Sequence, residues 1–146
     1  MKKTLLILFL FISTLGFSQD LNWQTDFETA KQIAQQENKS ILMYFTGSDW
    51  CAPCKQLKAD FFHSERFIEQ ADKLVLLMVD LPFRQDIITE EQRKKNKVLI
   101  KKYNKEESFP LLVSLSNQGR ETNRISAYSS LRDTTLHFNF LNSILN

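Results

Sequence analysis

The sequence is poor in the residues that hold small disulfide-rich folds together or build flexible linkers. Its 146 residues include two cysteines, three glycines and three prolines. A scaffold built from disulfides carries several distant cysteine pairs, whereas only two residues separate the cysteines here. A bridge across so short a loop removes little entropy from the unfolded chain. Stability therefore has to come from a hydrophobic core, and the cysteines have little structural work to do.

Histidine is equally scarce, which argues against a zinc site. A closed zinc site needs four ligands, and only His63 and His137 could join the two thiolates. His63 is expected at the far end of the helix that carries the cysteines. We therefore interpret both histidines as surface or boundary residues, and we expect no metal.

Apolar runs long enough to resemble a membrane span are absent except at the N-terminus. Two lysines precede the apolar residues 4–17, and the small residue Ser18 offers a cleavage site before Gln19. This layout is typical of a secretory signal peptide, and the run is too short for a comfortable span. We predict a signal peptide over residues 1–18 and no stable membrane insertion after its removal. Residues 19–146 are predicted to form one domain.

The sequence also has no excess of charge that would mark a nucleic-acid-binding surface. It contains 19 Lys and Arg residues against 17 Asp and Glu residues. Loss of the two lysines in the signal peptide would leave equal numbers of each sign. Lysines cluster between residues 94 and 102, but glutamates flank them on both sides, which is typical of a solvated helix face. We expect no nucleic-acid partner.

Hydrophobic periodicity predicts alternating helices and strands in the first half of the domain. Asp26 or Thr25 can cap the first helix, and Ser64 can cap a later short one. The expected elements are a helix at 26–37, a strand at 40–45, a helix carrying the cysteines that ends near 62–63, a short helix from 64 and a strand at 74–81. The last strand is almost wholly apolar, which suits a central strand covered on both faces.

The second half is predicted to contain two helices around a hairpin. A capping-box pattern at residues 89–92 opens a helix that ends near Tyr103. Two strands joined by a turn at Gly119 follow, and residues 129–130 cap the last helix. The predicted strands are 109–115 and 121–125, and the positions expected to pack are Val98, Leu99, Ile100, Tyr103, Leu131, Leu136, Phe138, Leu141, Ile144 and Leu145. This order of elements predicts an α/β fold with a central mixed β-sheet flanked by helices on both faces.

The two cysteines lie where the predicted strand 40–45 gives way to a helix. This places Cys51 at the helix N-terminus, where unpaired backbone N–H groups and the helix dipole favour a thiolate over a thiol. We expect Cys51 to be exposed there and Cys54 to lie one turn further into the helix. The thiolate is the form that attacks disulfides. Lys55 adds positive charge nearby, and Pro53 stiffens the first helical turn without losing a hydrogen-bond donor. The motif therefore predicts redox chemistry at Cys51 and Cys54.

Several strings along the chain resemble the thioredoxin superfamily. They are Trp50-Cys51-Ala52-Pro53-Cys54-Lys55 after an apolar strand, Asp80 at the end of a strand, Phe109-Pro110 opening a strand, and Gly119 in the hairpin. The lead-in Thr46-Gly47-Ser48-Asp49-Trp50 resembles exported members, including the C-terminal domain of the disulfide reductase DsbD. The resemblance runs from about residue 23 to the C-terminus and implies a thioredoxin-like fold. It also implies that Cys51 attacks a substrate disulfide and that Cys54 resolves the resulting mixed disulfide.

The resemblance further implies a groove for the substrate. Pro110 matches the family's cis-proline, which faces the cysteine pair and leaves the preceding residue, here Phe109, free to pair with the substrate backbone. A trans proline at the start of an edge strand is the alternative. Trp50 is expected to form an apolar wall beside the cysteines. Phe109 is bulkier than the residue usual in relatives and would favour apolar or extended partners.

Two features depart from the pattern of the family. Thioredoxins keep a buried aspartate beneath the cysteines, whereas the corresponding positions here are Tyr44 and Phe45. Asp49 is expected nearer the surface, where it could act through a water molecule. Residues 83–103 form an insertion, which either shapes a partner surface or is an elaborated solvent-facing helix.

These observations predict an exported thiol–disulfide oxidoreductase of the periplasm or cell envelope. The residues between the cysteines include no histidine, the residue that stabilises the thiolate in the oxidant DsbA, and this favours reduction of protein disulfides. A membrane-side thiol donor would supply the electrons. The cysteines carry those electrons themselves, so we expect no cofactor. The alternatives are a disulfide isomerase or oxidase and a non-catalytic peptide-binding module, and we expect a monomer because no dimerisation segment is evident.

Overall fold

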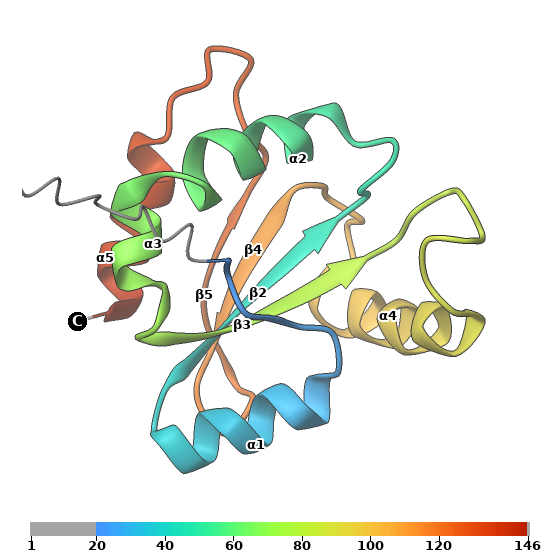
Figure 1. Ribbon diagram of the computed structural model, residues 1–146, viewed down its shortest axis with the longest axis horizontal. Coiled ribbons are helices and arrows are strands. Elements are labelled where there is room, and N and C mark those ends of the chain that lie inside the picture. Colours follow the sequence, from blue (N-terminus) through green and yellow to red (C-terminus); the bar gives the residue numbers. More distant parts are fainter. Residues whose placement is uncertain (1–19, 146) are drawn as a thin grey trace, which may run out of the picture.

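Five strands form one mixed sheet in the computed structural model, which describes residues 20–145 (Figure 1). The strands are β1 (Trp23–Gln24), β2 (Ser40–Thr46), β3 (Leu74–Asp80), β4 (Leu111–Leu115) and β5 (Glu121–Ser126), in the order β1-β3-β2-β4-β5. The pairs β1–β3 and β2–β3 are parallel, whereas β2–β4 and β4–β5 are antiparallel. The predicted mixed sheet is confirmed. The signal peptide predicted for residues 1–18 lies outside the described residues.

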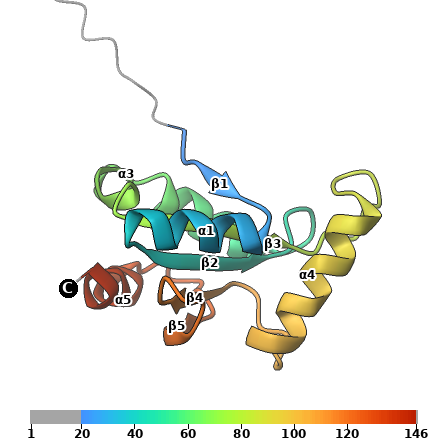
Figure 2. The ribbon, with the colours of Figure 1, turned by 90° about the horizontal axis from the view of Figure 1, so that it is seen from below.

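Helices cover both faces of this sheet (Figures 1 and 2). α1 (Phe27–Glu37) and α4 (Glu90–Tyr103) pack on one face, and α2 (Ala52–Leu57), the π-helical segment η1 (Lys58–Phe62), α3 (Glu65–Ala71) and α5 (Thr135–Leu145) pack on the other. Strand β2 shows why there are two hydrophobic layers, since its successive side chains alternate between the faces. Leu42 and Tyr44 join the α2 side, whereas Met43 and Phe45 join the α1 side. Among residues 20–145, no helix has the length and apolar character needed to cross a bilayer.

Side-chain caps begin α1 and α4 where the sequence predicts them. Asp26 Oδ1 accepts the backbone N–H of Thr29 at 2.9 Å. Thr89 Oγ1 accepts the backbone N–H of Gln92 at 3.1 Å, which forms the first half of the predicted capping box. The Gln92 side chain donates instead to the carbonyl of Thr25 at 2.7 Å. The N-terminal turn of α4 is therefore joined to the segment that precedes α1.

The last helix begins later than the sequence predicts, at Thr135 and not at residues 129–130. The reason is Asp60 of η1, whose carboxylate accepts a 2.7 Å hydrogen bond from the hydroxyl of Tyr128 and pairs with Arg132. Arg132 has a φ of 56°, in the left-handed region that ends helical geometry. Leu131, predicted to pack in this helix, therefore lies before it and is exposed. Leu136 of α5 and Val98 of α4 were also predicted to pack, but each lies on the exposed face of its helix.

Two elements are not apparent in the sequence pattern. Strand β1 has two residues at the edge of the sheet, too few to show a period. The helix that carries the cysteines continues from α2 into the π-helical η1, which buries Phe61 and Phe62 side by side. Both rings contact Phe67 of α3, so η1 places an aromatic cluster under the far end of the cysteine helix.

Candidate active site

The two cysteines lie at the start of α2, directly after β2, and they form a disulfide, Cys51–Cys54. Cys51 is the N-cap of α2, and its Sγ accepts the backbone N–H of Cys54 at 3.3 Å. Both side chains are buried, with exposed fractions of 3% and 1%. The expectation that Cys51 would be exposed is therefore wrong for this disulfide-bonded form. The N–H group directed at Cys51 Sγ would stabilise negative charge on that sulfur once the disulfide is reduced.

Pro53 and Lys55 both lie on the exposed side of α2. Pro53 is in the first turn, where its missing N–H costs no helical hydrogen bond. The ammonium of Lys55 donates to the backbone carbonyl of Asp49 at 2.9 Å. Lys55 is therefore engaged with the loop that precedes Cys51 and fixes that loop against the helix.

Tyr44 lies beneath the cysteine pair. Its hydroxyl donates to the carbonyl of Cys54 at 3.1 Å. Burial raises the pKa of Tyr44 to about 12, so the phenol is protonated at neutral pH and acts as a donor. Phe45, the other residue considered for this position, joins the opposite hydrophobic layer. Strand β2 thus supplies a neutral hydroxyl beneath Cys54 and no carboxylate.

Three aromatic rings, which we call the aromatic rim, lie at this end of the sheet: Trp50, Phe83 and Phe109. The Trp50 ring stacks on Phe83 with centroids 5.1 Å apart and meets Phe109 edge-on at 5.3 Å. Trp50 is held by its Nε1–H, which donates to the carbonyl of Leu81 at 2.8 Å. It also lies against Gly47, where an added Cβ would come within 2.2 Å of the indole, so only glycine allows this approach.

Phe109 and Pro110 place the start of β4 beside this rim. The peptide bond between them is cis. The carbonyl of Pro110 accepts the backbone N–H of Ala127 at 2.9 Å, which joins β4 to the end of β5. Phe109 packs against both hydrophobic layers, so its ring sits at the edge where the two layers meet.

Asp49 is half-buried, and its carboxylate is bound by the backbone of a neighbouring loop. Its two carboxylate oxygens accept the backbone N–H groups of Phe83 at 3.0 Å and Arg84 at 2.9 Å. Desolvation alone would raise the pKa of this carboxyl group, but these N–H groups hold it below its usual value. Asp49 therefore ties the loop after β3 to the loop that carries Trp50, and Figure 1 shows these two loops side by side.

Helix α4 holds the same loop from its other side. The guanidinium of the buried Arg93 donates to the carbonyl of Pro82 at 2.6 Å and to that of Arg84 at 3.0 Å. Its Nε makes no hydrogen bond within the described residues, and the nearest carboxylate oxygen, of Glu90, lies 3.9 Å away. Asn96, also buried, donates to the carbonyl of Asp80 at 2.7 Å. The helix of the insertion therefore supports the backbone of residues 80–84.

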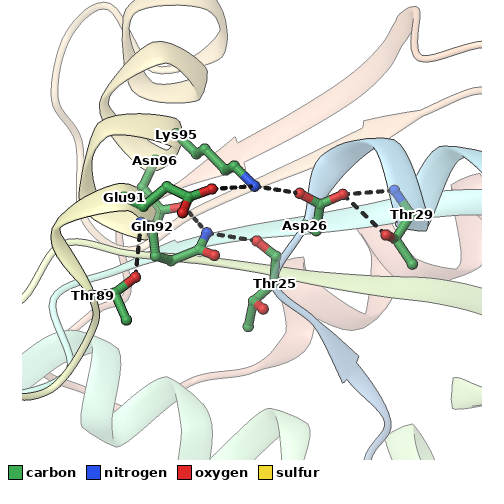
Figure 3. Close-up of polar contacts among 8 residues, drawn as sticks. All are labelled: Thr25, Asp26, Thr29, Thr89, Glu91, Gln92, Lys95 and Asn96. Carbon is green, nitrogen blue, oxygen red and sulfur yellow. Dashed lines mark hydrogen bonds and ion pairs between the residues drawn. The ribbon is translucent and has the colours of Figure 1, made fainter.

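Contacts with Thr25 and with Asp26, the N-cap of α1, fix α4 in turn (Figure 3). The ammonium of Lys95 lies 3.2 Å from the carboxylate of Asp26 and 3.3 Å from that of Glu91. Gln92 donates to the carbonyl of Thr25 and, at 2.8 Å, to the side chain of Asn96. Exposed ion pairs of this kind add little stability singly, but the network also includes the buried Asn96.

The two histidines differ from each other. His63 is exposed, in agreement with the predicted surface or boundary position, whereas His137 is buried in α5 and the same prediction is wrong for it. The reason is that the rings of Phe61 and Tyr128 pack against the imidazole. Within residues 20–145, no group of three or more His, Cys, Asp or Glu side chains is arranged to hold a metal ion.

The geometry agrees with what comparison with known proteins shows. Residues 22–116 match the model of a family described as thioredoxin-like. The chain belongs to this thioredoxin-like family. The match includes the cysteine pair, the rim and the insertion, whereas β5 and α5 lie beyond it.

Curated relatives of this thioredoxin-like chain include two proteins of Chlamydia pneumoniae. The thioredoxin-related protein DsbJ is 30% identical over 135 residues, which are 88% of this chain and 38% of DsbJ. The disulfide bond reductase DsbH is 34% identical over 107 residues, which are 73% of this chain and 63% of DsbH. The chain thus spans less than two thirds of the length of either relative.

Solved structures similar to this chain include a DsbH oxidoreductase, with a TM-score of 0.73 and 30% identity. The aligned region covers 86% of this chain and 84% of that one. The C-terminal domain of DsbD from Neisseria meningitidis, in its oxidised form, has a TM-score of 0.59 at 13% identity and covers 80% of this chain and 90% of that one. This second likeness shows the fold alone. The resemblance to the thioredoxin superfamily and to DsbD is confirmed at the level of the fold.

Sequence reasoning missed the position of Phe83 in this thioredoxin-like site. A solvent-exposed phenylalanine in a polar loop carries no periodic signal. The one signal in the sequence is Asp49, which directly precedes Trp50 and Cys51. Its carboxylate has two acceptor oxygens that can bind the backbone N–H groups of a nearby loop.

Proposed function

We propose that this thioredoxin-like protein is an exported thiol–disulfide oxidoreductase that reduces disulfides in other proteins. The observation that carries the proposal is the position of Cys51 as the N-cap of α2, with the N–H of Cys54 directed at its sulfur. A thiolate at Cys51 gains from this donor, and a thiolate is the attacking species in disulfide exchange. The relationship to the disulfide bond reductase DsbH supports the same chemistry.

The reaction takes two exchange steps. In the first, the Cys51 thiolate attacks one sulfur of the substrate disulfide, forming a mixed disulfide and releasing the other substrate cysteine as a thiolate, which takes up a proton. In the second, Cys54 loses its proton and attacks Cys51 Sγ, which breaks the mixed disulfide and frees the remaining substrate thiolate. Two electrons pass to the substrate, and Cys51–Cys54 becomes a disulfide. A dithiol donor then returns two electrons by the same exchange.

The remaining predicted site residues have supporting roles in this proposal. Trp50 shields the mixed disulfide from water, and Phe109 and Pro110 line the groove that receives the extended substrate backbone. Pro53 stiffens the first turn of α2, and Lys55 fixes the loop before Cys51 through its bond to Asp49. The cysteine sulfurs carry the electrons, so no cofactor takes part.

The direction of electron flow is proposed to be reductive. The dipeptide Ala52-Pro53 between the cysteines has no side chain that would stabilise the reduced form strongly, as an oxidant needs. We further propose export through the signal peptide over residues 1–18, action in the periplasm or cell envelope as a monomer, and recharging by a membrane-side thiol donor. An oxidising compartment has no reducing buffer of its own, so such a donor is required.

Two measurements on the purified chain test this proposal. The wild type is expected to speed the reduction of insulin disulfides by dithiothreitol, whereas Cys51→Ala does not. Equilibration with glutathione is expected to give a potential near that of thioredoxin, about −270 mV. No acceleration by the wild type would refute the catalytic role, and a potential near that of DsbA, about −120 mV, would refute the reductive direction.

A further inference from the structure

We propose that Phe83 determines substrate specificity, because with Trp50 and Phe109 it forms a binding site for an apolar side chain next to the cysteine of an extended polypeptide. This inference rests on the proposed function. It assigns to the insertion a task in recognition, through a residue far from the cysteines in sequence. The occupant is the chain that carries the disulfide to be reduced.

The first observation is the exposure of Phe83 beside the cysteine loop. Its side chain is 73% exposed, yet its ring is stacked on Trp50, the residue that directly precedes Cys51. A phenylalanine with so much apolar surface in water adds little to the core. Clustered exposed aromatic rings are typical of surfaces that bind other chains, where rigid rings act as anchors.

The second observation is that the backbone around Phe83 is bound from both sides. Asp49 accepts the N–H groups of Phe83 and Arg84, and Trp50 donates to the carbonyl of Leu81. The buried Arg93 donates to the carbonyls of Pro82 and Arg84. The ring is therefore held in place before any partner arrives, so little conformational entropy would be lost on binding.

The charged side chains near the aromatic rim already have partners within this chain. The rim therefore favours an apolar side chain of the substrate over a charged one. The carboxylate of Asp49 is engaged with two backbone N–H groups, and the ammonium of Lys55 with a backbone carbonyl. Arg84 forms a two-bonded ion pair with Asp86. No free charge among these groups is left to attract an oppositely charged side chain. Phe83 stacks on Trp50, the residue directly before Cys51, and an extended chain advances about 3.3 Å per residue. We therefore expect the residue adjacent to the attacked cysteine to lie beside the ring of Phe83.

The test compares two peptides that each contain one intramolecular disulfide and differ only in the residue next to the first cysteine, Leu or Ser. The kcat/KM for reduction of each peptide is measured with the full chain and a dithiol donor. The wild type is expected to prefer the Leu peptide by about tenfold, the usual range for an apolar pocket. Phe83→Ala is expected to reduce this preference to about twofold, and Phe83→Tyr to preserve it, because tyrosine retains the ring.

Leu136→Ala is the matched control, since Leu136 is 68% exposed on α5, at the opposite side of the molecule from the loop that carries Phe83 (Figure 1). It is expected to keep the wild-type preference. Equal kcat/KM values for the two peptides in the wild type, or an unchanged preference in Phe83→Ala, would overturn the role of Phe83. A wild type that reduces neither peptide nor hydroxyethyl disulfide, which has no flanking residue, would refute the proposed function itself.

Discussion

Burial of His137 favours its neutral imidazole over the charged imidazolium. Desolvation lowers the pKa of His137, and its Nδ1 makes no hydrogen bond within the described residues. In the unfolded chain the group returns to a pKa of about 6.5. Between the two values the unfolded chain binds more protons than the folded one, so the free energy of unfolding falls as the pH drops through about 6.5.

We therefore expect wild-type stability, measured by urea unfolding, to be lower at pH 5 than at pH 7.5. His137→Gln is expected to lose less stability than the wild type over the same interval, because the titrating group is gone. The exposed His63, replaced by Gln, serves as the control and should leave the wild-type difference unchanged. Carboxylates with lowered pKa, such as Asp26 and Asp60, lose their contribution only at lower pH and do not enter this window. An equal pH dependence in His137→Gln and the wild type would show that His137 is not responsible.

Single residues at the site were only partly predictable. The cysteine pair and Trp50 follow from a motif of adjacent residues, which a sequence displays directly. Tyr44 shows only as a strand residue, because its contact with Cys54 depends on the face of β2 that α2 covers. The pairing of Asp49 with Phe83 and Arg84 joins positions 34 and 35 apart in the chain, and no local pattern encodes such a contact.

Among the elements, α4 has the most specific task, since it supports the loop between β3 and its own first turn. Replacing Arg93 by Met keeps the buried stem of the side chain but removes the donors to Pro82 and Arg84. We expect a loss of about 1.5–3 kcal/mol in the free energy of unfolding, the usual contribution of a hydrogen bond that involves a charged group. Amide hydrogens of residues 81–86, of which only Pro82 has none, are expected to exchange faster in this variant, because their loop loses one of its two supports.

The neighbouring Lys94 is exposed and provides the matched control as Lys94→Met. It should change stability by less than about 0.5 kcal/mol and leave exchange in the loop unaltered. If Arg93→Met left the exchange of residues 81–86 at the wild-type rate, the support assigned to α4 would be wrong.

Helices with clear caps were the elements that the sequence predicted best. Asp26, Ser64 and Thr89 each accept a backbone N–H in the first turn of a helix, and this local chemistry is visible in a sequence. The start of α5 was misplaced because Ser129 and Ser130 offer the same chemistry. Asp60 prevails there by binding Tyr128 and Arg132 across 68 and 72 positions, a tertiary contact that overrides the local preference.

For the whole molecule, the two hydrophobic layers explain why the thioredoxin-like fold was predictable. The apolar runs of β2 and β3 require cover on both faces, and the amphipathic α1 and α4 supply one of the two covers. The hydrophobic pattern could not predict that the start of the insertion, residues 83–103, contacts the cysteine loop. The loop at residues 81–84 reaches the cysteine loop through contacts at the ends of β2 and β3, which lie side by side only in the folded sheet.

The order of attack assigned to the cysteines is tested most directly by trapping. The full chain carrying Cys54→Ala is produced in cells, and acid is added to stop thiol–disulfide exchange. Free thiols are then alkylated, and the disulfide-linked complexes of the variant are identified by mass spectrometry. We expect mixed disulfides between Cys51 and proteins of the cell envelope, because removing Cys54 stops the second exchange step. Cys51→Ala should trap none. Complexes formed through Cys54 in Cys51→Ala, or none in Cys54→Ala, would show that Cys51 is not the attacking thiol.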